Sequence, residues 1–523
     1  MEHHTMETFI SDLPKYHVLR PKQQENTARL IAISKKFLKK ANINHEDIPS
    51  ISERTIVLEC GHQPNFLPHA GTWKKAFCLN RICNQLIENG NQPVAFFGLA
   101  DQNISTARLL AKNQFPDLNK NGFTKIGFKI KNDDKLRSFN RIPKPPAEQW
   151  QKEINTLELH YRNISEKTKF HNDIIKNQWN QILEILWTSY ERAENFAELN
   201  SLVFARICSE LFNINLFFFL YSEMHHSDFL FLDESKTILR NFRQFNQIYN
   251  QEIAGNNLNI PPVLPNHLPF WYECECGVKL DLNPDPSGVC DTTCPVCLKK
   301  ICLCFDPDFE NSEQYYKKMD FNAVSRNIIM AHGLGVSLFL SGTGGSSVYG
   351  RISDRISHNL GFHRPVTLAW QSKDHYLGMM HKIMVWDLMK EFSLSPCDFI
   401  NGTLQEKTGQ RFSAISRNIR EAEGNNNEKD IKYFNGLENS AKNLVAFTRN
   451  MFTATPSFID ILANFQQDII IKMWEKAISD SEIEKTGYMN RLRADINYPV
   501  IFLQEIQPAE LPVFYESVRN LGV

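Results

Sequence analysis

The chain has almost no net charge and contains no long run of apolar residues. Its 58 basic side chains are matched by 59 acidic ones, so no overall basic field is available to attract nucleic acid or anionic lipid. The longest apolar run, around residues 211–220, is interrupted by Asn213 and Asn215 and is too short to cross a bilayer. The sequence therefore predicts no membrane-spanning segment and argues against nucleic acid as a partner.

The first residues also lack the basic, apolar and small segments of a secretory signal. No repeat of fixed period and no low-complexity tail is present. Hydrophobic residues make up 42% of the chain and charged residues 22%, which excludes general disorder. We expect a folded cytoplasmic protein, and at 523 residues its length predicts two to four domains or one core with large insertions.

One βαβ unit can be recognised near the N-terminus. A β-branched strand pattern at 54–60 is followed by the loop Gly61–Gly71 and by an amphipathic helix from Pro68 or His69 to about Glu88. Asn89-Gly90 is a typical helix stop, and residues 93–99 form a second strand pattern. A ligand site is expected at this strand-to-helix junction, because free N–H groups and the helix dipole attract phosphate or carboxylate.

The residue types within this loop favour such a site. Gly61 and Gly71 permit a tight turn and close approach of a ligand around Gln63, and Pro68 suits the first helical turn. Two imidazoles, His62 and His69, lie beside the helix N-terminus and can donate protons or hydrogen bonds. The alternative interpretation is a tight connection without function.

Three charged residues of this βαβ unit are considered as site residues: Lys74, Lys75 and Asp101. Lys74 and Lys75, on the predicted helix, are expected to be solvated. Asp101 directly follows the second strand, and ligand groups in open parallel sheets gather at the carboxyl ends of strands. We therefore take Asp101 as a further candidate site residue.

A second strand-to-helix loop occurs far downstream, after an apolar strand pattern at 336–340. It offers successive backbone N–H groups suited to an anion: Ser341, Gly342, Thr343, Gly344 and Gly345. The segment lacks the lysine of a P-loop, so a surface turn is the alternative. On the helix that follows, Arg351 and Arg355 share a face and can clamp a carboxylate or phosphate, and the commoner alternative is that both are solvated helix charges.

Cysteine is concentrated in one segment. Seven of the 12 cysteines lie between Cys274 and Cys304, in a turn-rich stretch unlike its flanks. Two pairs resemble the knuckles of a zinc ribbon, and we predict a structural Zn²⁺ bound by Cys274, Cys276, Cys294 and Cys297. The other three cysteines of the segment, Cys290, Cys302 and Cys304, could replace one of these ligands, so the choice of four stays open.

The remaining pattern alternates strands and helices. Further strands are expected at 126–130, 215–220, 229–232, 336–340 and 365–370. Further helices are expected at 20–40, 147–210, 235–249, 321–332, 348–360 and 376–449, the last broken by a turn at 423–427. We divide the chain into five parts. They are an N-terminal helical arm (1–53), the first part of an α/β core with a helical insertion (54–260), the zinc-ribbon insertion (261–320), the second part of the core (321–375) and a helical C-terminal region (376–523).

Three landmarks in this order resemble the bacillithiol biosynthesis cysteine-adding enzyme family: the loop Gly61–Gly71, the segment Pro93–Asn103 and the segment Ser341–Gly345. The resemblance implies an α/β fold with a Rossmann-like parallel sheet, related to nucleotidyltransferases and class I aminoacyl-tRNA synthetases. It also implies connective insertions and C-terminal helices, a coiled coil among them, that form a homodimer. The His62-Gln63-Pro64 opening is also similar to that of another transferase family.

The resemblance implies a cysteine-ligase-like enzyme. Such an enzyme forms an amide between an amino acid, cysteine for this family, and a small carboxylate or amino-sugar conjugate, with ATP or another nucleotide for activation. In this hypothesis His62 and His69 stabilise charge, Asp101 orients an amine or ribose, and Gly342–Gly345 cradles phosphate. The alternative is a non-catalytic RNA- or protein-binding protein that uses the zinc ribbon as its contact surface.

Overall fold

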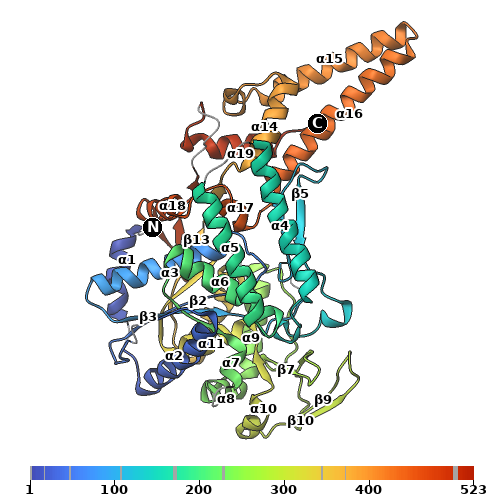
Figure 1. The fold of residues 1–523 in the computed structure, drawn as a ribbon. Coiled ribbons are helices and arrows are strands. Elements are labelled where there is room, and N and C mark those ends of the chain that lie inside the picture. The colour runs from blue at the N-terminus through green and yellow to red at the C-terminus, as the bar shows by residue number, and fades with distance from the viewer. Residues whose placement is uncertain are drawn as a thin grey trace.

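The computed structural model shows a sheet-centred body from which a pair of long helices projects (Figure 1). It describes residues 3–16, 18–45, 49–105, 109–168, 173–226, 230–342, 345–371, 373–498 and 505–522. No helix in these ranges combines the length and apolar character needed to cross a membrane.

A mostly parallel eight-stranded sheet forms the core and confirms the predicted α/β class. In spatial order its strands are β1 (His3–Thr5), β15 (Glu482–Thr486), β16 (Met489–Arg493), β13 (Val366–Gln371), β12 (Val336–Gly342), β2 (Ile56–His62), β3 (Pro93–Leu99) and β6 (Phe217–Leu220). The six strands from β16 to β6 pair in parallel, and β15 is antiparallel to both of its neighbours. All seven residues of β3 are buried, as expected for a strand covered on both faces.

The order of the parallel strands determines where a ligand site can form. Numbered along the chain, β2, β3, β6, β12, β13 and β16 lie in the spatial order 3-2-1-4-5-6. The chain therefore leaves the middle of the sheet in both directions, and the reversal falls between β2 and β12. In open α/β sheets the crevice outside the carboxyl ends of two such strands is where ligands bind.

Helices cover both faces of this sheet. On β2, Cys60 lies near Lys75 of α3 (Ala70–Glu88), whereas Glu59 lies near Arg326 of α11 (Ala323–Leu334). Adjacent residues of a strand point to opposite faces, so α3 and α11 lie on opposite sides. The other helices of the body are α1 (Met6–Asp12), α2 (Pro21–Ala41), α4 (Ala147–Thr168), α5 (Asp173–Arg192), α6 (Phe196–Phe212), α7 (Tyr221–His226), α8 (Leu232–Arg240), α9 (Phe242–Asn256), α10 (Glu313–Tyr316) and α13 (Arg351–Leu360).

One predicted strand is wrong. Residues 230–231 form a turn, and Leu232 begins α8, while Phe229 lies outside the described residues. Leu230 and Phe231 are buried as the apolar pattern required, but they are buried in a turn before an amphipathic helix. Short apolar runs do not distinguish a buried strand from other buried backbone.

Smaller sheets lie outside the core. Strands β4 (Lys112–Pro116) and β5 (Phe123–Gly127) form a hairpin. The strand predicted at 126–130 overlaps only the end of β5. The cysteine-rich segment forms two sheets from β7 (Phe270–Glu273), β8 (Lys279–Asp281), β9 (Val289–Thr293), β10 (Lys300–Cys304) and β11 (Met319–Phe321). Strands β14 (Asp374–His375) and β17 (Ile496–Asn497) form a further parallel pair.

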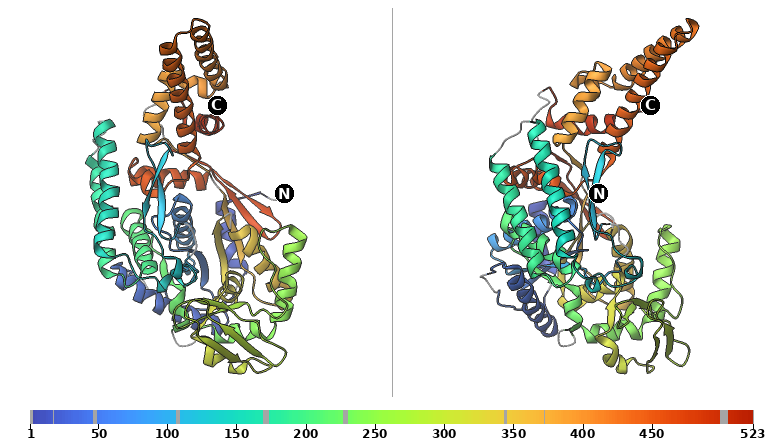
Figure 2. Two further views of the ribbon diagram at one scale, coloured as in Figure 1. Left: turned by 90° about the vertical axis from the view of Figure 1, so that its right-hand side faces the viewer. Right: turned by 45° about the vertical axis from the view of Figure 1, so that its right-hand side comes forward.

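The C-terminal region is largely helical, but it also completes the main sheet. Its helices are α14 (Met379–Phe392), α15 (Leu404–Gly424), α16 (Glu428–Thr453), α17 (Phe458–Leu462), α18 (Gln467–Ser479) and α19 (Leu511–Arg519). The predicted turn at 423–427 is confirmed, and α15 and α16 form a hairpin that extends away from the sheet (Figure 2). Strands β15 and β16, which follow α18, were not predicted.

Candidate functional site

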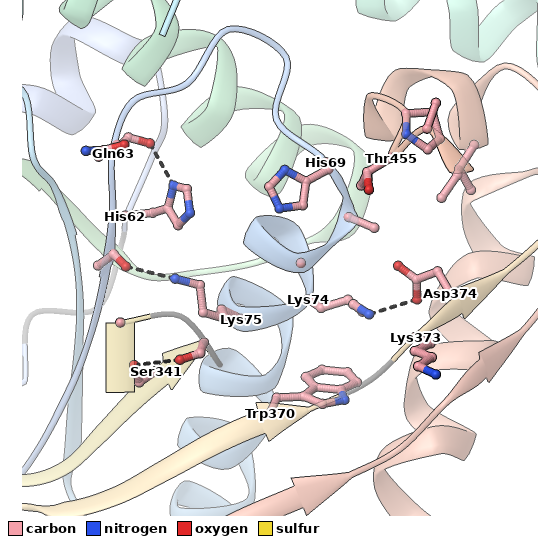
Figure 3. Close-up of a pocket in the computed structure, with 18 of the residues that line it drawn as sticks. His62, Gln63, His69, Lys74, Lys75, Ser341, Trp370, Lys373, Asp374 and Thr455 are labelled. Carbon is pink, nitrogen blue, oxygen red and sulfur yellow. Dashed lines mark hydrogen bonds and ion pairs between the residues drawn. The ribbon is translucent and has the colours of Figure 1, made fainter. Parts of the chain in front are cut away.

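A cavity of about 700 Å³ opens at the carboxyl ends of β2, β12 and β13. Its lining brings together both predicted loops, which are about 270 residues apart in sequence. The predicted site residues that line it are Gly61, His62, Gln63, His69, Gly71, Ser341, Gly342 and Gly345. Thr343 and Gly344 lie outside the described residues. Figure 3 shows both imidazoles beside the first turn of α3, with Ser341 on one side and Asp374 on the other.

The loop after β2 is held by distant side chains. Leu67 adopts a positive φ of 44°, and its carbonyl accepts hydrogen bonds from Asn113 Nδ2 and Ser457 Oγ, both at 2.7 Å. The carbonyl of Pro64 accepts one from Asn200 Nδ2 at 2.8 Å. These buried partners satisfy backbone groups that the irregular loop leaves free, so the loop is a fixed platform for its histidines.

Two details of the predicted turn are corrected. Gly61 lies inside β2 and Gly71 inside α3, so neither supplies a turn conformation. Pro68 precedes the N-cap residue His69 and therefore lies outside the helix. The left-handed residue of the loop is Leu67, whose conformation is imposed by tertiary contacts rather than by glycine.

Gly61 is nevertheless needed, for a different reason. It lies opposite Gly98 in the register of β2 and β3. A Cβ at Gly98 would lie 2.4 Å from the Tyr221 ring, and one at Gly61 would lie 3.1 Å from the Tyr221 hydroxyl. The two glycines therefore make room for this aromatic ring.

His62 is held as a neutral imidazole. Its Nδ1 lies 2.8 Å from the carbonyl oxygen of Gln63, which can only accept, so Nδ1 carries the hydrogen. Burial and the nearby Lys75 lower the pKa of His62 well below its usual value, and the pKa of His69 is lowered by the same two causes. At neutral pH, His62 Nε2 is therefore an available proton acceptor, 3.4 Å from Thr72 Oγ1.

The expectation that Lys74 and Lys75 are solvated is wrong. Their exposed fractions are 4% and 7%, and both line the cavity. Lys75 Nζ donates to the carbonyl of Gly61 at 2.9 Å, and burial lowers the pKa of Lys75. Lys74 Nζ lies 2.8 Å from Asp374 Oδ1 and 5.5 Å from the centre of the Trp370 ring. These ammonium groups are thus part of the site.

Arg326 adds an unpaired donor. Its Nη1 is buried and has no hydrogen-bond partner among the described residues, while its guanidinium lies 4.9 Å from the Tyr221 ring centre. The cationic lining residues are Lys74, Lys75, Arg326, Lys373 and Arg519. Asp374 is the one acidic residue in the described lining, so the cavity is positively charged and suited to an anion.

His375 was not predicted as a site residue. It lines the cavity with 7% of its surface exposed, and neither ring nitrogen has a partner among the described residues. The sequence contained a usable signal, because Lys373, Asp374 and His375 closely follow the strand predicted at 365–370. The rule that selected Asp101 applies equally to them.

Asp101 does not belong to this cavity. It is fully buried, and its two carboxylate oxygens accept hydrogen bonds from the backbone N–H of Ser222, at 2.9 Å, and from the Ser222 hydroxyl. The carboxylate therefore caps the start of α7, and it is absent from the lining of the cavity. Burial raises the pKa of Asp101 to about 6, while these hydrogen bonds oppose the rise.

The helix-borne arginines have an internal partner. Arg351 and Arg355 share a face as expected, but their Nε atoms lie 3.5 and 3.6 Å from the carboxylate of Glu252 on α9. They do not line the cavity, so they join α13 to α9 instead of binding a ligand there.

The four predicted metal ligands come together. The Sγ atoms of Cys274, Cys276, Cys294 and Cys297 all lie within 4.8 Å of one another. Two pairs, Cys274–Cys297 and Cys276–Cys294, are 3.5 Å apart. Zn–S bonds of about 2.3 Å give a tetrahedron with edges of about 3.8 Å, so the cluster can hold a metal such as zinc.

The local backbone explains how both pairs converge. After the first pair, Gly277 has a φ of +86° and its N–H donates to the Cys274 carbonyl. After the second pair, Leu298 has a φ of 61° and its N–H donates to the Cys294 carbonyl. Each pair therefore lies on a tight turn that points its sulfurs inward. The four cysteines do not line the cavity at β2 and β12.

Comparison with known proteins adds no family assignment. No protein-family model matches the sequence, and no curated protein matches it.

Proposed function

We propose that the protein is an amide-forming ligase that activates a carboxylate with a nucleoside triphosphate. The observation that carries the proposal is the cation-rich cavity at the carboxyl ends of β2 and β12, where the strand order reverses. In line with the family resemblance, the amino acid is cysteine and its partner is a small carboxylate or amino-sugar conjugate.

A Rossmann-like core is part of this proposal. The 3-2-1-4-5-6 order of the parallel strands is that of dinucleotide-binding sheets, in which phosphate groups lie against the first helix N-terminus. In this chain the equivalent helix is α3, whose N-cap is His69. The β- and γ-phosphates would lie against its first N–H groups, the ammonium of Lys75 and the Ser341–Gly342 backbone.

The reaction needs two displacements. A carboxylate oxygen attacks the α-phosphorus, a P–O bond forms, and pyrophosphate leaves. The amine nitrogen then attacks the acyl carbon, the nucleoside monophosphate leaves, and the amine loses a proton. Lys75 and Arg326 would neutralise phosphate charge, and the unprotonated Nε2 of His62, which lies beside the Thr72 hydroxyl, would accept the amine proton.

Zinc at the cysteine cluster has a structural role in this proposal. Four thiolates complete a tetrahedron and leave no open position for substrate, and the cluster is not among the residues that line the cavity. The metal would fold the module that carries β7 and β8, in which Glu273 pairs with Arg141 of the segment between β5 and α4.

Isotope exchange between ATP and labelled pyrophosphate tests the activation step. We expect exchange that requires a carboxylate substrate and falls at least about tenfold in Lys75→Met, since one charge contact to phosphate is lost. Arg81→Met, on the exposed side of α3, is the matched control and should retain the rate. Absence of exchange with all carboxylates tried, together with salt-dependent RNA retention, would favour the binding-protein alternative.

A further inference from the structure

A second cavity of about 730 Å³ adjoins the first. It is lined by the residues that follow β3, by α9 and α11, and by β7 and β8 of the cysteine-rich module. The two cavities share lining residues at their border, among them Gly61, His62, Gln63 and Arg326. The imidazole of His62 therefore lies between the two spaces.

A buried glutamine amide lines this second cavity. Gln102 is 2% exposed, lines the cavity, and neither Oε1 nor Nε2 forms a hydrogen bond with the described residues. Asn246 Oδ1, also in the lining, is buried and unpaired as well. Buried polar groups are almost always paired, so these atoms indicate a missing partner. The amide of Gln102 presents an acceptor beside a donor, and its complement is a donor beside an acceptor.

The rest of the lining favours an uncharged ligand with a flat or apolar face. Aromatic rings of Trp271, Tyr249 and Phe245 line the cavity. The ammonium of Lys279 is paired with Asp320, and the other two charged lining residues, Arg326 and Asp281, have opposite signs, so the lining carries little net charge. Uncharged amides also line this cavity: Asn103, Asn246, Asn283, Asn322 and Asn327. Aromatic faces and amides together bind neutral polar molecules better than anions.

We propose that this second cavity binds a neutral polar small molecule through a donor–acceptor pair held by Gln102, with Trp271 against its flat face. Carboxamides, vicinal diols and nucleobase edges share this chemistry. The cysteine-rich module supplies one wall of the site through β7 and β8. The bound molecule is the uncharged part of the second substrate, which reacts across His62 with the group in the first cavity. That last assignment rests on the proposed function, but the binding itself does not.

Titration calorimetry of the full chain tests the proposal with nicotinamide, glucose and adenine as probes of the three chemistries. We expect at least one probe to bind, and Gln102→Leu to weaken that probe by about tenfold or more through loss of the paired hydrogen bonds. The Tm of unliganded Gln102→Leu should equal or exceed that of the wild type, because the removed amide forms no hydrogen bond within the described part of the chain.

A matched buried glutamine provides the control. Gln178 is 6% exposed, donates to the carbonyls of Leu462 and Phe465, and accepts from the N–H of Gln467. Gln178→Leu should lower the Tm and leave probe affinity unchanged. The proposal is overturned if no probe binds the wild type, or if Gln102→Leu lowers the Tm as much as Gln178→Leu does. Pyrophosphate exchange is measured separately, so its absence would affect only the proposed function.

Discussion

Replacement of one cluster cysteine, Cys294→Ser, should release the metal and unfold the module around it. The Sγ atoms of Cys294 and Cys276 are 3.5 Å apart, near the tetrahedral edge of about 3.8 Å expected for zinc. A serine hydroxyl is a much poorer ligand than a thiolate. The site would keep three sulfur ligands and gain an open coordination position. Its affinity for the metal would therefore be lower than that of the closed four-sulfur site.

The magnitude follows from the number of ligands. Structural zinc sites contribute about 10–16 kcal/mol in small zinc domains, so one of four thiolates accounts for about 3 kcal/mol. This loss corresponds to an affinity about 100-fold lower. The affected backbone extends from β7 to β10, because both cysteine turns connect these strands. The core sheet should stay folded, since its strands belong to a separate sheet.

Elemental analysis and limited proteolysis measure the two effects. The wild type should hold about one zinc ion per chain, Cys294→Ser should lose it during dialysis, and new cleavage should fall within residues 274–304. Cys302→Ser is the matched control, because Cys302 is exposed on β10 and outside the cluster. Equal metal loss in both variants, or wild-type protein without metal, would refute the reasoning.

Three further outcomes are expected. Burial raises the pKa of Glu59 to about 8 in the folded chain. The unfolded chain loses this proton near pH 4.5 and the folded chain keeps it up to about pH 8, so stability falls as pH rises between these two values. This loss of stability, up to about 1.4 kcal/mol per pH unit, should be absent in Glu59→Gln. The Tm difference between the variant and the wild type should therefore grow from pH 5 to pH 8, and a constant difference would contradict this. Gly98→Ala should destabilise by about 1–3 kcal/mol in urea because its Cβ meets Tyr221, whereas Gly409→Ala, in open helix, should stabilise slightly; equal effects would exclude the steric explanation. Because the pKa of His62 is lowered, its imidazole should stay neutral as pH falls from 8 to 6.5, and NMR resonances of the His62 ring that titrate in that range would contradict this.

Much of the core could be predicted because its strands are continuous apolar runs with clear ends. The buried segments at β2, β3, β12 and β13 gave strong local patterns, and both site loops were located from the strand ends alone. The choice among seven clustered cysteines came from knuckle spacing, and the geometry agrees with it.

The missed features depend on distant partners that no local pattern contains. The burial of Lys74 depends on Asp374, 300 residues away. The requirement for glycine at position 61 depends on Tyr221, and the capping role of Asp101 depends on Ser222. Strands β15 and β16 are short and half-polar, so only pairing with β13 makes them part of the sheet.

The central claim is that the loop after β2 and the carboxyl end of β12 hold one anion together. ATP titration calorimetry on one variant from each side, Lys75→Met and Gly342→Val, tests it most directly, because a side chain at Gly342 would lie beside Lys75 and cover the backbone there, with Arg81→Met as control. The account predicts measurable wild-type affinity that falls about tenfold or more in both variants and stays unchanged in the control. Unchanged affinity in either variant, or no binding by the folded wild type, would contradict it.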